Sequence, residues 1–332
     1  MRKVRGFTLI ELLIAMVLGL VIVGSVMAVM LANKRSYRTN EGLSQVQESA
    51  RTAYELLAHD LRQTDGNGCG SSVRTANVLT AGTLWWQNWF GITGFDSTQV
   101  DPAVATGTGI GERVAGTDSI HVESMDGPGL AVAAHNPATY RVDINPATPS
   151  DFVPNDIMVL CDFDHTTIFR ATAGTGASNV FHTNASGAAP VNCSRGLGFP
   201  TSCASTTGNV YEFPRNSQIG RLVAVDWYIG NNGRAGEGGR SLYRRRLDVG
   251  GVEVTEEVVA GITDMQMQFR ATGSDTIIAD ASLVTDWSVI SSVLIQITAQ
   301  SSDINVTTAP GLNSGRVERP FNYLISLRNR LP

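Results

Sequence analysis

Hydrophobic residues follow two different patterns along this chain, and the change between them lies near residue 65. Residues 12–33 include no charged side chain. A helix of that length is about 33 Å long, and the hydrocarbon core of a bilayer is about 30 Å thick. The stretch is therefore long enough to span a membrane. It is also longer than the apolar core of a cleaved secretory signal peptide.

A helical stripe continues from the apolar stretch. Apolar residues recur every three or four positions at Leu43, Val46, Ala50, Tyr54, Leu57 and Leu61. This spacing places them on one face of a helix that packs against another element. The two patterns together predict one helix over residues 7–62, with Gly42 as a weak point where it could bend. The glycine-rich segment 65–70 predicts its end.

After residue 70 the pattern changes to short apolar runs that are typical of strands. Strands are predicted at 118–123, 156–161, 166–171, 219–229, 241–247, 262–270, 289–299 and 322–327. Residues 264–270 alternate strictly between polar and apolar, as in a strand with one buried face. The glycine-rich link between Ile229 and Leu242 predicts a hairpin loop.

The remaining segments of the second part show no clear period. Residues 71–117, 125–155 and 172–208 are predicted to be long loops. The chain is therefore expected to be an α+β protein, with one long N-terminal helix packed on a large antiparallel β-rich head.

Composition and charge narrow the class of protein. Charged residues make up only 17% of the chain, and 34 residues are glycine, which suits a β-rich extracellular domain better than a helical cytosolic enzyme. The formal net charge is −5, so the chain shows no basic footprint for nucleic acid.

The four cysteines indicate an oxidising compartment. Cys69, Cys161, Cys193 and Cys203 all follow the apolar stretch, and none forms a C-x-x-C pair. Three pairings are open, and we favour Cys193 with Cys203, which closes a short loop and leaves Cys69 with Cys161. Four buried free thiols are the alternative.

One carboxylate breaks the apolar pattern near the N-terminus. Glu11 lies inside the sequence RGFTLIELLIAMVLGLVIVG, where a lone charge is costly and needs a partner. Residues 5–11, RGFTLIE, resemble the cleavage and methylation motif of type IV prepilins. The resemblance implies that a prepilin peptidase cuts after Gly6 and methylates the new amine of Phe7. Glu11 then becomes the fifth residue of the mature chain.

Cleavage after Gly6 creates the partner that Glu11 needs. The new ammonium at Phe7 lies one helical turn from Glu11, so the two charges could pair within one chain. In an assembled fibre the resemblance implies that Glu11 pairs with the Phe7 amine of a neighbouring subunit. Glu11 is therefore a candidate determinant of assembly and axial register, and the sequence leaves open which amine it meets.

Weaker motifs elsewhere resemble PilW-type minor pilins, in the same order along the chain. They lie at 60–63 with 68–69, 155–162, 242–245, 258–262 and 326–331. The resemblance implies a tip-proximal complex that primes pilus assembly, with effects on twitching, adhesion and DNA uptake. J-type pseudopilins of type II secretion systems share the layout and remain an alternative. A second alternative is a signal-anchored periplasmic binding protein or enzyme.

The resemblance also divides the chain and implies its partners. Residues 1–6 would be the leader, 7–33 the transmembrane or fibre-core half of the helix, 34–65 its amphipathic half, and 66–332 a periplasmic head. Expected partners are other minor pilins, the major pilin, the prepilin peptidase, the inner-membrane assembly platform and a tip adhesin. The chain would move from the inner membrane to the pilus.

Catalytic and metal-binding patterns are not found in the sequence. The five histidines are scattered, and no nucleophile motif or ligand spacing is present, so we expect no enzyme activity, no cofactor and no metal. The turn at 162–165 is expected to be solvated. Trp85, Trp86 and Trp89 cluster in one segment, where they could form either core or a partner interface, and core is favoured.

Overall fold

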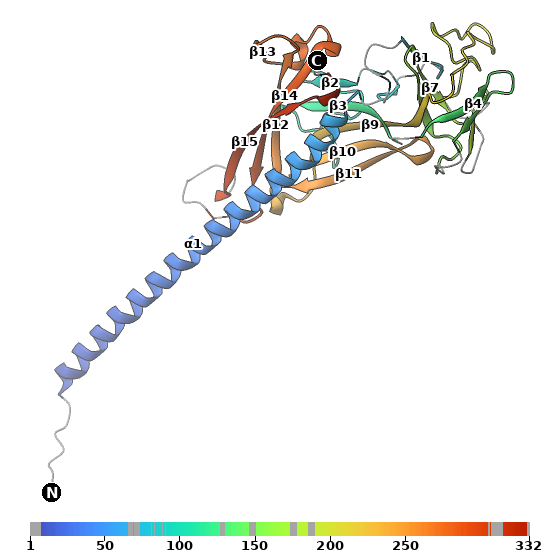
Figure 1. Ribbon diagram of the computed structural model, residues 1–332. Coiled ribbons are helices and arrows are strands. Elements are labelled where there is room, and N and C mark those ends of the chain that lie inside the picture. Colours follow the sequence, from blue (N-terminus) through green and yellow to red (C-terminus); the bar gives the residue numbers. More distant parts are fainter. Residues whose placement is uncertain are drawn as a thin grey trace.

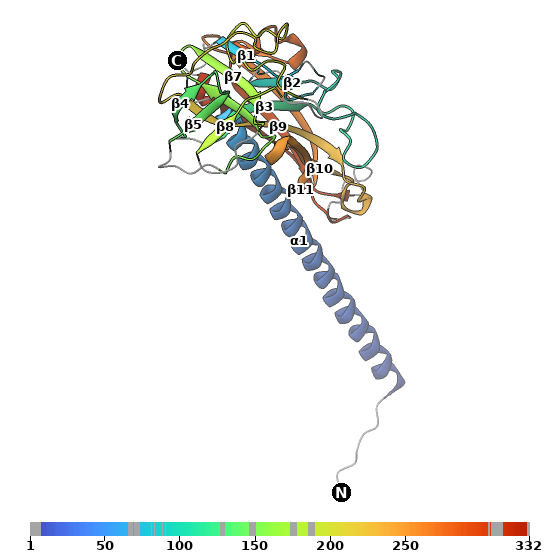
Figure 2. The ribbon, with the colours of Figure 1, turned by 90° about the vertical axis from the view of Figure 1, so that its right-hand side faces the viewer.

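The computed structural model describes residues 8–65, 69, 74–80, 82, 84–87, 89, 91–126, 130–145, 151–172, 178–184, 190–304, 306 and 315–330. One long helix, α1 (Leu9–Gln63), leads into a head built from three β-sheets (Figure 1). Only the second half of α1 lies against the head, and the first half extends away from it (Figures 1 and 2). The α+β architecture expected from the sequence is confirmed.

Helix α1 has 55 residues, which corresponds to about 82 Å at about 1.5 Å per residue. It begins at Thr8, which caps the first turn, and ends at Thr64. It runs through Gly42 without interruption, and Figure 1 shows no sharp bend along it. A Cβ atom added at Gly42 would lie 3.3 Å from Ser301 Cβ, so this glycine marks a close approach between helix and head.

The largest sheet has eight strands in the order β1-β7-β6-β9-β10-β11, with β3 also pairing β9 and β2 pairing β3. These strands are β1 (Arg74–Asn77), β2 (Ile92–Phe95), β3 (Ser119–Asp126), β6 (Ile157–Cys161), β7 (His165–Arg170), β9 (Gln218–Asn231), β10 (Arg240–Asp248) and β11 (Val252–Ala260). All of its pairings are antiparallel except that of β1 with β7. The long strand β9 joins the two halves of the sheet, since it pairs with β6, β3 and β10.

Two smaller antiparallel sheets complete the head. The four-stranded sheet has the order β13-β12-β14-β15, with β12 (Ile262–Ala271), β13 (Ile277–Ile278), β14 (Ile290–Gln300) and β15 (Glu318–Ser326). The three-stranded sheet contains β4 (Val132–Asn136), β5 (Arg141–Ile144) and β8 (Asn179–Phe181). Short 3-10 helices lie at Ala235–Glu237, Val249–Gly251, Ala281–Leu283, Trp287–Val289 and Arg328–Arg330.

The main core forms where the second half of α1 meets the sheets. The fully buried residues of the helix are Gly42, Val46, Ala50, Ala53, Leu57, Ala58 and Leu61. They pack with alternate residues of β12, which buries Met265, Met267 and Phe269 as the alternation predicted. Because four of the seven helix residues are glycine or alanine, the helix backbone approaches the sheets closely.

The structure also corrects the expected loops. The segments 71–117, 125–155 and 172–208 contain the short strands β1, β2, β4, β5 and β8. Strand β11 was likewise not predicted. The eight predicted strands correspond to β3, β6, β7, β9, β10, β12, β14 and β15, and β9 and β10 form the hairpin expected around the glycine-rich link.

Candidate functional site

The first turn of α1 holds the candidate assembly site. Gly6 and Phe7, the residues expected to flank the cleavage point, lie outside the described residues. The Glu11 carboxylate accepts two hydrogen bonds through Oε2, from the Thr8 N–H at 2.9 Å and from Thr8 Oγ1 at 2.8 Å. The Glu11 N–H donates back to Thr8 Oγ1 at 3.4 Å, which completes a capping box.

The capping box gives Glu11 a partner within its own helical turn. Thr8 was not predicted to be part of the site, although Thr8 and Glu11 have the T-x-x-E spacing of this motif. Negative charge is also favourable at a helix N-terminus because the first N–H groups point outward. Glu11 can therefore stabilise the start of α1 through its contact with Thr8.

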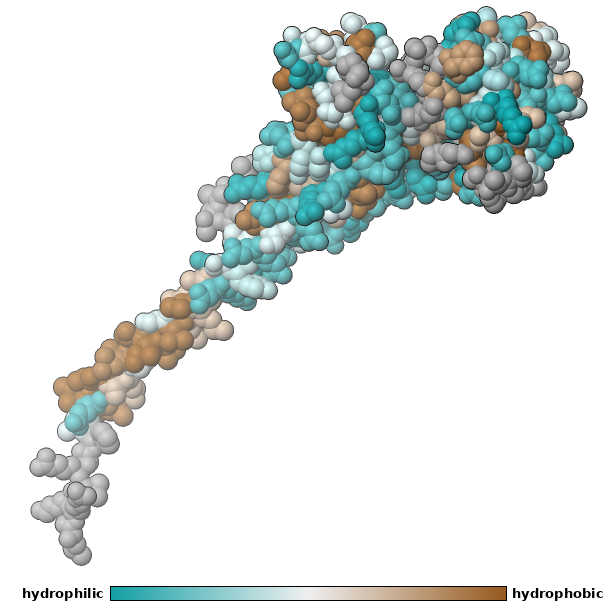
Figure 3. Space-filling model, viewed as in Figure 1, coloured by the Kyte–Doolittle hydropathy of each residue, from teal (hydrophilic) through white to brown (hydrophobic). Residues whose placement is uncertain are grey.

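The first half of α1 presents an uncovered apolar surface. Its large side chains are more than half exposed, and Leu9 reaches 77%. Figure 3 shows this surface as a continuous apolar band along the helix, next to a mostly hydrophilic head. By length and composition, α1 could cross a membrane. Apolar surface of this extent is unstable in water, so it requires lipid or other apolar helices around it.

Contacts with the head begin immediately after this apolar surface. Thr39 Oγ1 donates to the Val306 carbonyl at 3.0 Å, and Gly42 lies against Ser301. Further along, the Tyr54 ring stacks on Tyr323 of β15 with a centroid separation of 4.1 Å. The helix is thus attached to the head from about residue 39 onward.

The C-terminal end of α1 is fixed by polar contacts to three parts of the head. Asp60 Oδ2 accepts from the indole N–H of the buried Trp227 on β9 at 3.0 Å. Asp65 pairs with Arg330 at 2.9 Å, and its N–H donates to the Glu123 carbonyl at 2.9 Å. These contacts make the exposed half of the helix a stalk whose direction is set by the head.

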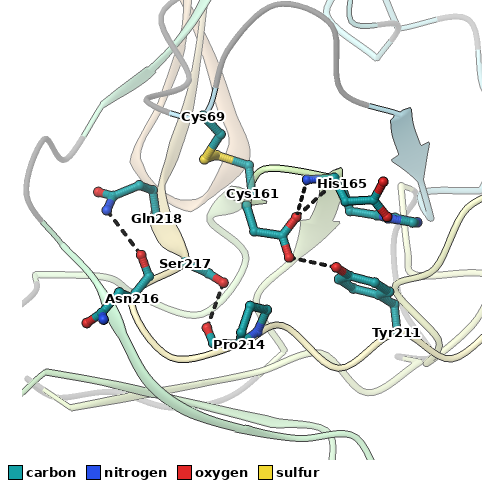
Figure 4. The surroundings of a disulfide bond; sticks show 10 residues. Cys69, Cys161, His165, Tyr211, Pro214, Asn216, Ser217 and Gln218 are labelled. Carbon is teal, nitrogen blue, oxygen red and sulfur yellow. Dashed lines mark hydrogen bonds and ion pairs between the residues drawn. A yellow bond between two sulfur atoms is a disulfide. The ribbon is translucent and has the colours of Figure 1, made fainter.

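Two disulfides cross-link the head, one across a long loop and one across a short loop. Cys69 pairs with Cys161 and Cys193 pairs with Cys203, the two pairs favoured from the sequence. The first disulfide joins the segment after α1 to the last residue of β6, next to His165 and Tyr211 (Figure 4). It restrains the chain at the point where the helix leads into the head.

The turn at 162–165 is less solvated than expected. Asp162 and His165 are buried, while Phe163 is exposed. Asp162 accepts from the Tyr211 hydroxyl at 2.7 Å, and His165 Nε2 accepts from the Phe199 N–H at 2.8 Å. The turn therefore anchors a neighbouring loop. Among the described residues no cluster of three histidine, cysteine or acidic side chains could hold a metal ion.

The tryptophan cluster is part of the core. Trp85 and Trp86 are buried, with Trp86 only 2% exposed, and Trp89 is partly buried against the same cluster. The indole N–H of Trp86 donates to Glu253 of β11 at 2.9 Å. The partner interface considered for these residues is therefore disfavoured, because a partner could not reach Trp85 or Trp86 without unfolding this part of the head.

A buried charged cluster holds the loop between β2 and β3. Arg113 is 1% exposed, and its guanidinium donates to the carbonyls of Phe95, Asp96, Gln99 and Thr117. Burial raises the pKa of Asp226 on β9 well above its ordinary value, and the nearby Asp101 carboxylate raises it further. Arg113 acts in the opposite direction on both carboxylates. The hydrogen bonds of Arg113, and those that Asp101 accepts from Ala103 and Ser119, fix this loop.

A groove of about 790 Å³ lies beside the C-terminal end of α1. Its wall includes arginines from α1, β9, β10 and the C-terminal segment, namely Arg62, Arg221, Arg244, Arg246 and Arg328. Several of them already pair with acids, as Arg221 does with Asp156 at 2.8 Å. The groove therefore carries mixed charge and shows no single ligand chemistry.

Comparison with known proteins gives one match, at the N-terminus. Residues 1–27 match the family model described as "Prokaryotic N-terminal methylation motif". No curated protein and no solved structure matches the chain. The matched residues include the Thr8–Glu11 capping box and the start of the uncovered apolar surface. The chain therefore carries a type IV prepilin-like methylation motif on an apolar N-terminal helix, which supports the class of pilins and pseudopilins.

Proposed function

We propose that this chain is a minor pilin of the PilW type. Before assembly, the first half of α1 anchors the chain in the inner membrane, and the head lies in the periplasm. Cleavage after Gly6 and methylation of Phe7 then prepare it to enter a pilus. There it joins other minor pilins in a tip-proximal complex that primes assembly, with consequences for twitching, adhesion and DNA uptake.

The observation that carries the proposal is the uncovered apolar half of α1, attached to a methylation motif at one end and to a rigid head at the other. A simple membrane anchor needs neither the motif nor a fixed direction relative to its head. A fibre subunit needs both, because its helix must pack in a defined register among other helices. The polar contacts of Asp60 and Asp65 hold the helix in one direction.

Glu11 supports the proposal through its chemistry. Before cleavage its carboxylate is used by Thr8 in the capping box. After cleavage, the ammonium of Phe7 offers a charged donor, which makes a stronger hydrogen bond than a neutral one. In a low-dielectric fibre core an unpaired carboxylate is costly. A subunit is therefore held best at the axial position where its Glu11 meets the amine of its neighbour.

The disulfides support a periplasmic head. All four cysteines are paired, and such bonds persist in oxidising compartments. The proposed partners are the prepilin peptidase, the inner-membrane assembly platform, the major pilin, other minor pilins and a tip adhesin. We propose a structural role without catalysis.

Deletion of the chain tests this function directly. Surface pili should be lost or strongly reduced, and a plasmid copy of the wild type should restore them. A copy with Glu11→Gln should fail to restore them, whereas Glu48→Gln, an exposed acid on the same helix, should succeed. In a strain without prepilin peptidase the chain should accumulate uncleaved. If the deletion strain has normal pili and the chain pulls down pseudopilins of a secretion system, the minor-pilin proposal is wrong and the chain is a pseudopilin.

A further inference from the structure

A group of cations follows the uncovered apolar surface. We call Lys34, Arg35 and Arg38 the basic collar; all three side chains are exposed. Tyr37, in the same turn of α1, is 69% exposed. Exposed cations and an aromatic hydroxyl at the end of an apolar helix are the groups that favour the membrane–water interface. The leader also has basic residues, but the collar stays with the mature chain.

The axial position of the collar matches the headgroup layer. The uncharged stretch ends at residue 33, and Arg38 lies five residues further along the helix. That distance is about 7.5 Å at about 1.5 Å per residue. The polar layer on each side of a bilayer is about 5–7.5 Å thick. All three cations therefore lie at the depth of the lipid phosphates when the apolar stretch fills the hydrocarbon core.

The angular position of the collar gives one broad cationic face. At about 100° per residue, Arg38 lies about 40° from Lys34 around the helix, and Arg35 lies about 100° from it. Tyr37 lies on the other side of Lys34, by about 60°. One side of the helix is thus cationic and the adjacent side carries the tyrosine, so several lipid headgroups could be contacted at once.

The collar has no acidic partner among the described residues. Within the part of the chain that the structure describes, no ion pair involves Lys34, Arg35 or Arg38, although Glu41 lies one turn above Arg38. Arg51, further along the same helix, behaves differently, because it pairs with Glu55 at 2.8 Å. The charge of the collar is therefore available to an outside anion.

The head begins directly above the collar and sets which anion can reach it. Thr39 already contacts Val306, so the collar lies between the apolar surface and the head without a spacer. Just above the collar, the exposed acids Glu41 and Glu48 of α1 and Asp303 of the head line one groove. An anionic surface is therefore attracted at the level of the collar and repelled at the level of these acids.

We propose that the basic collar binds the headgroup phosphates of anionic phospholipids in the leaflet beneath the head. The inference rests on the proposed membrane-anchored stage of the protein. Binding fixes how deeply α1 sits and keeps the head close to the membrane surface. Each cation near an anionic surface strengthens binding about fivefold. The three together give an effect of up to about a hundredfold, which decreases as salt rises.

The test compares lipid retention by the full chain. Wild type is extracted in mild detergent with equal amounts of phosphatidylglycerol and phosphatidylcholine, and bound lipids are counted by native mass spectrometry. We expect a strong preference for phosphatidylglycerol. The variant with Lys34→Gln, Arg35→Gln and Arg38→Gln should lose most of that preference.

A matched control removes the same charge from the head. It carries Arg215→Gln, Arg319→Gln and Arg328→Gln, three exposed arginines that do not belong to α1. This control should retain phosphatidylglycerol as the wild type does. Equal retention by the collar variant, or equal loss in the control, would overturn the inference. So would a collar variant that keeps its lipid but no longer enters pili, because the collar would then bind a protein partner.

The same samples separate this inference from the proposed function. Their intact masses show whether the leader has been removed. A wild-type chain that stays uncleaved in a strain with prepilin peptidase contradicts the pilin function, yet its lipid preference still tests the collar. A cleaved chain without lipid preference contradicts only the collar.

Discussion

The two disulfides should contribute unequally to stability, because they close loops of very different length. Cys69 and Cys161 are 92 residues apart in sequence, and Cys193 and Cys203 are 10 apart. A cross-link restricts the unfolded chain more when the loop is longer. The chain-entropy relation gives about 4.6 kcal/mol for the first disulfide and about 2.7 kcal/mol for the second. Removing the first should therefore cost about 2 kcal/mol more.

Two double alanine variants, one for each disulfide, measure this difference. Urea unfolding of the full chain in detergent can be followed by tryptophan fluorescence, because all five tryptophans lie after residue 84. The variant without the long-loop disulfide should also show a larger m-value, since its unfolded state is more expanded. Equal losses in the two variants, or a greater loss without the short-loop disulfide, would refute the reasoning.

Three further predictions concern buried positions. Arg113→Met should lower the free energy of unfolding by about 3–5 kcal/mol, because it leaves buried carbonyls without their donor and removes the positive charge near the buried carboxylates of Asp101 and Asp226, and urea unfolding measures this loss. Gly42→Leu should destabilise by about 1–3 kcal/mol through overlap with Ser301, while Gly42→Ala should change stability by less than about 1 kcal/mol, as thermal unfolding will show. Burial lowers the pKa of His182 to about 3, below its ordinary value of 6.5. As the pH falls below about 6.5, His182 is therefore protonated in the unfolded state but not in the folded state, and the free energy of unfolding decreases. Near pH 5, His182→Phe should therefore take up about one proton fewer than the wild type when it unfolds. The difference between the two proteins is measured because Asp118, whose pKa burial raises to about 6, releases a proton on unfolding and so acts in the opposite direction.

The sequence predicted the elements with strong periodicity. The helix was expected over 7–62 and spans Leu9–Gln63. Strand β12 was expected from its strict alternation, and β9 from its apolar run. In each case local spacing alone identifies the buried face, so no knowledge of distant contacts is needed.

The missed strands have physical reasons in common. Strands β1, β2, β4, β5 and β8 have only three to five residues, too few to show a period. Strand β11 is long, but it lies at the edge of its sheet and carries glutamates that pair with arginines of β10, as Glu256 does with Arg244 at 2.5 Å. Polar residues on both faces of an edge strand hide the alternation that identifies a half-buried one.

The candidate site was predictable in part. Glu11 stood out because a carboxylate is unusual in an apolar helix. Its contact with Thr8 followed from a spacing already present in the sequence, although it was not identified. The buried arginine Arg113 gave no signal, because its partners are backbone carbonyls brought together by the fold.

If Glu11 takes a processed chain into pili, quantitative mass spectrometry of sheared pili will detect it there. We expect a small amount of this chain in wild-type pili, with N-methylated Phe7 as its first residue. We also expect that Glu11→Ala removes the chain from the pilus fraction while the protein remains in the membrane. Wild-type pili without the chain, or pili that contain Glu11→Ala at the wild-type level, would show that Glu11 does not have this role.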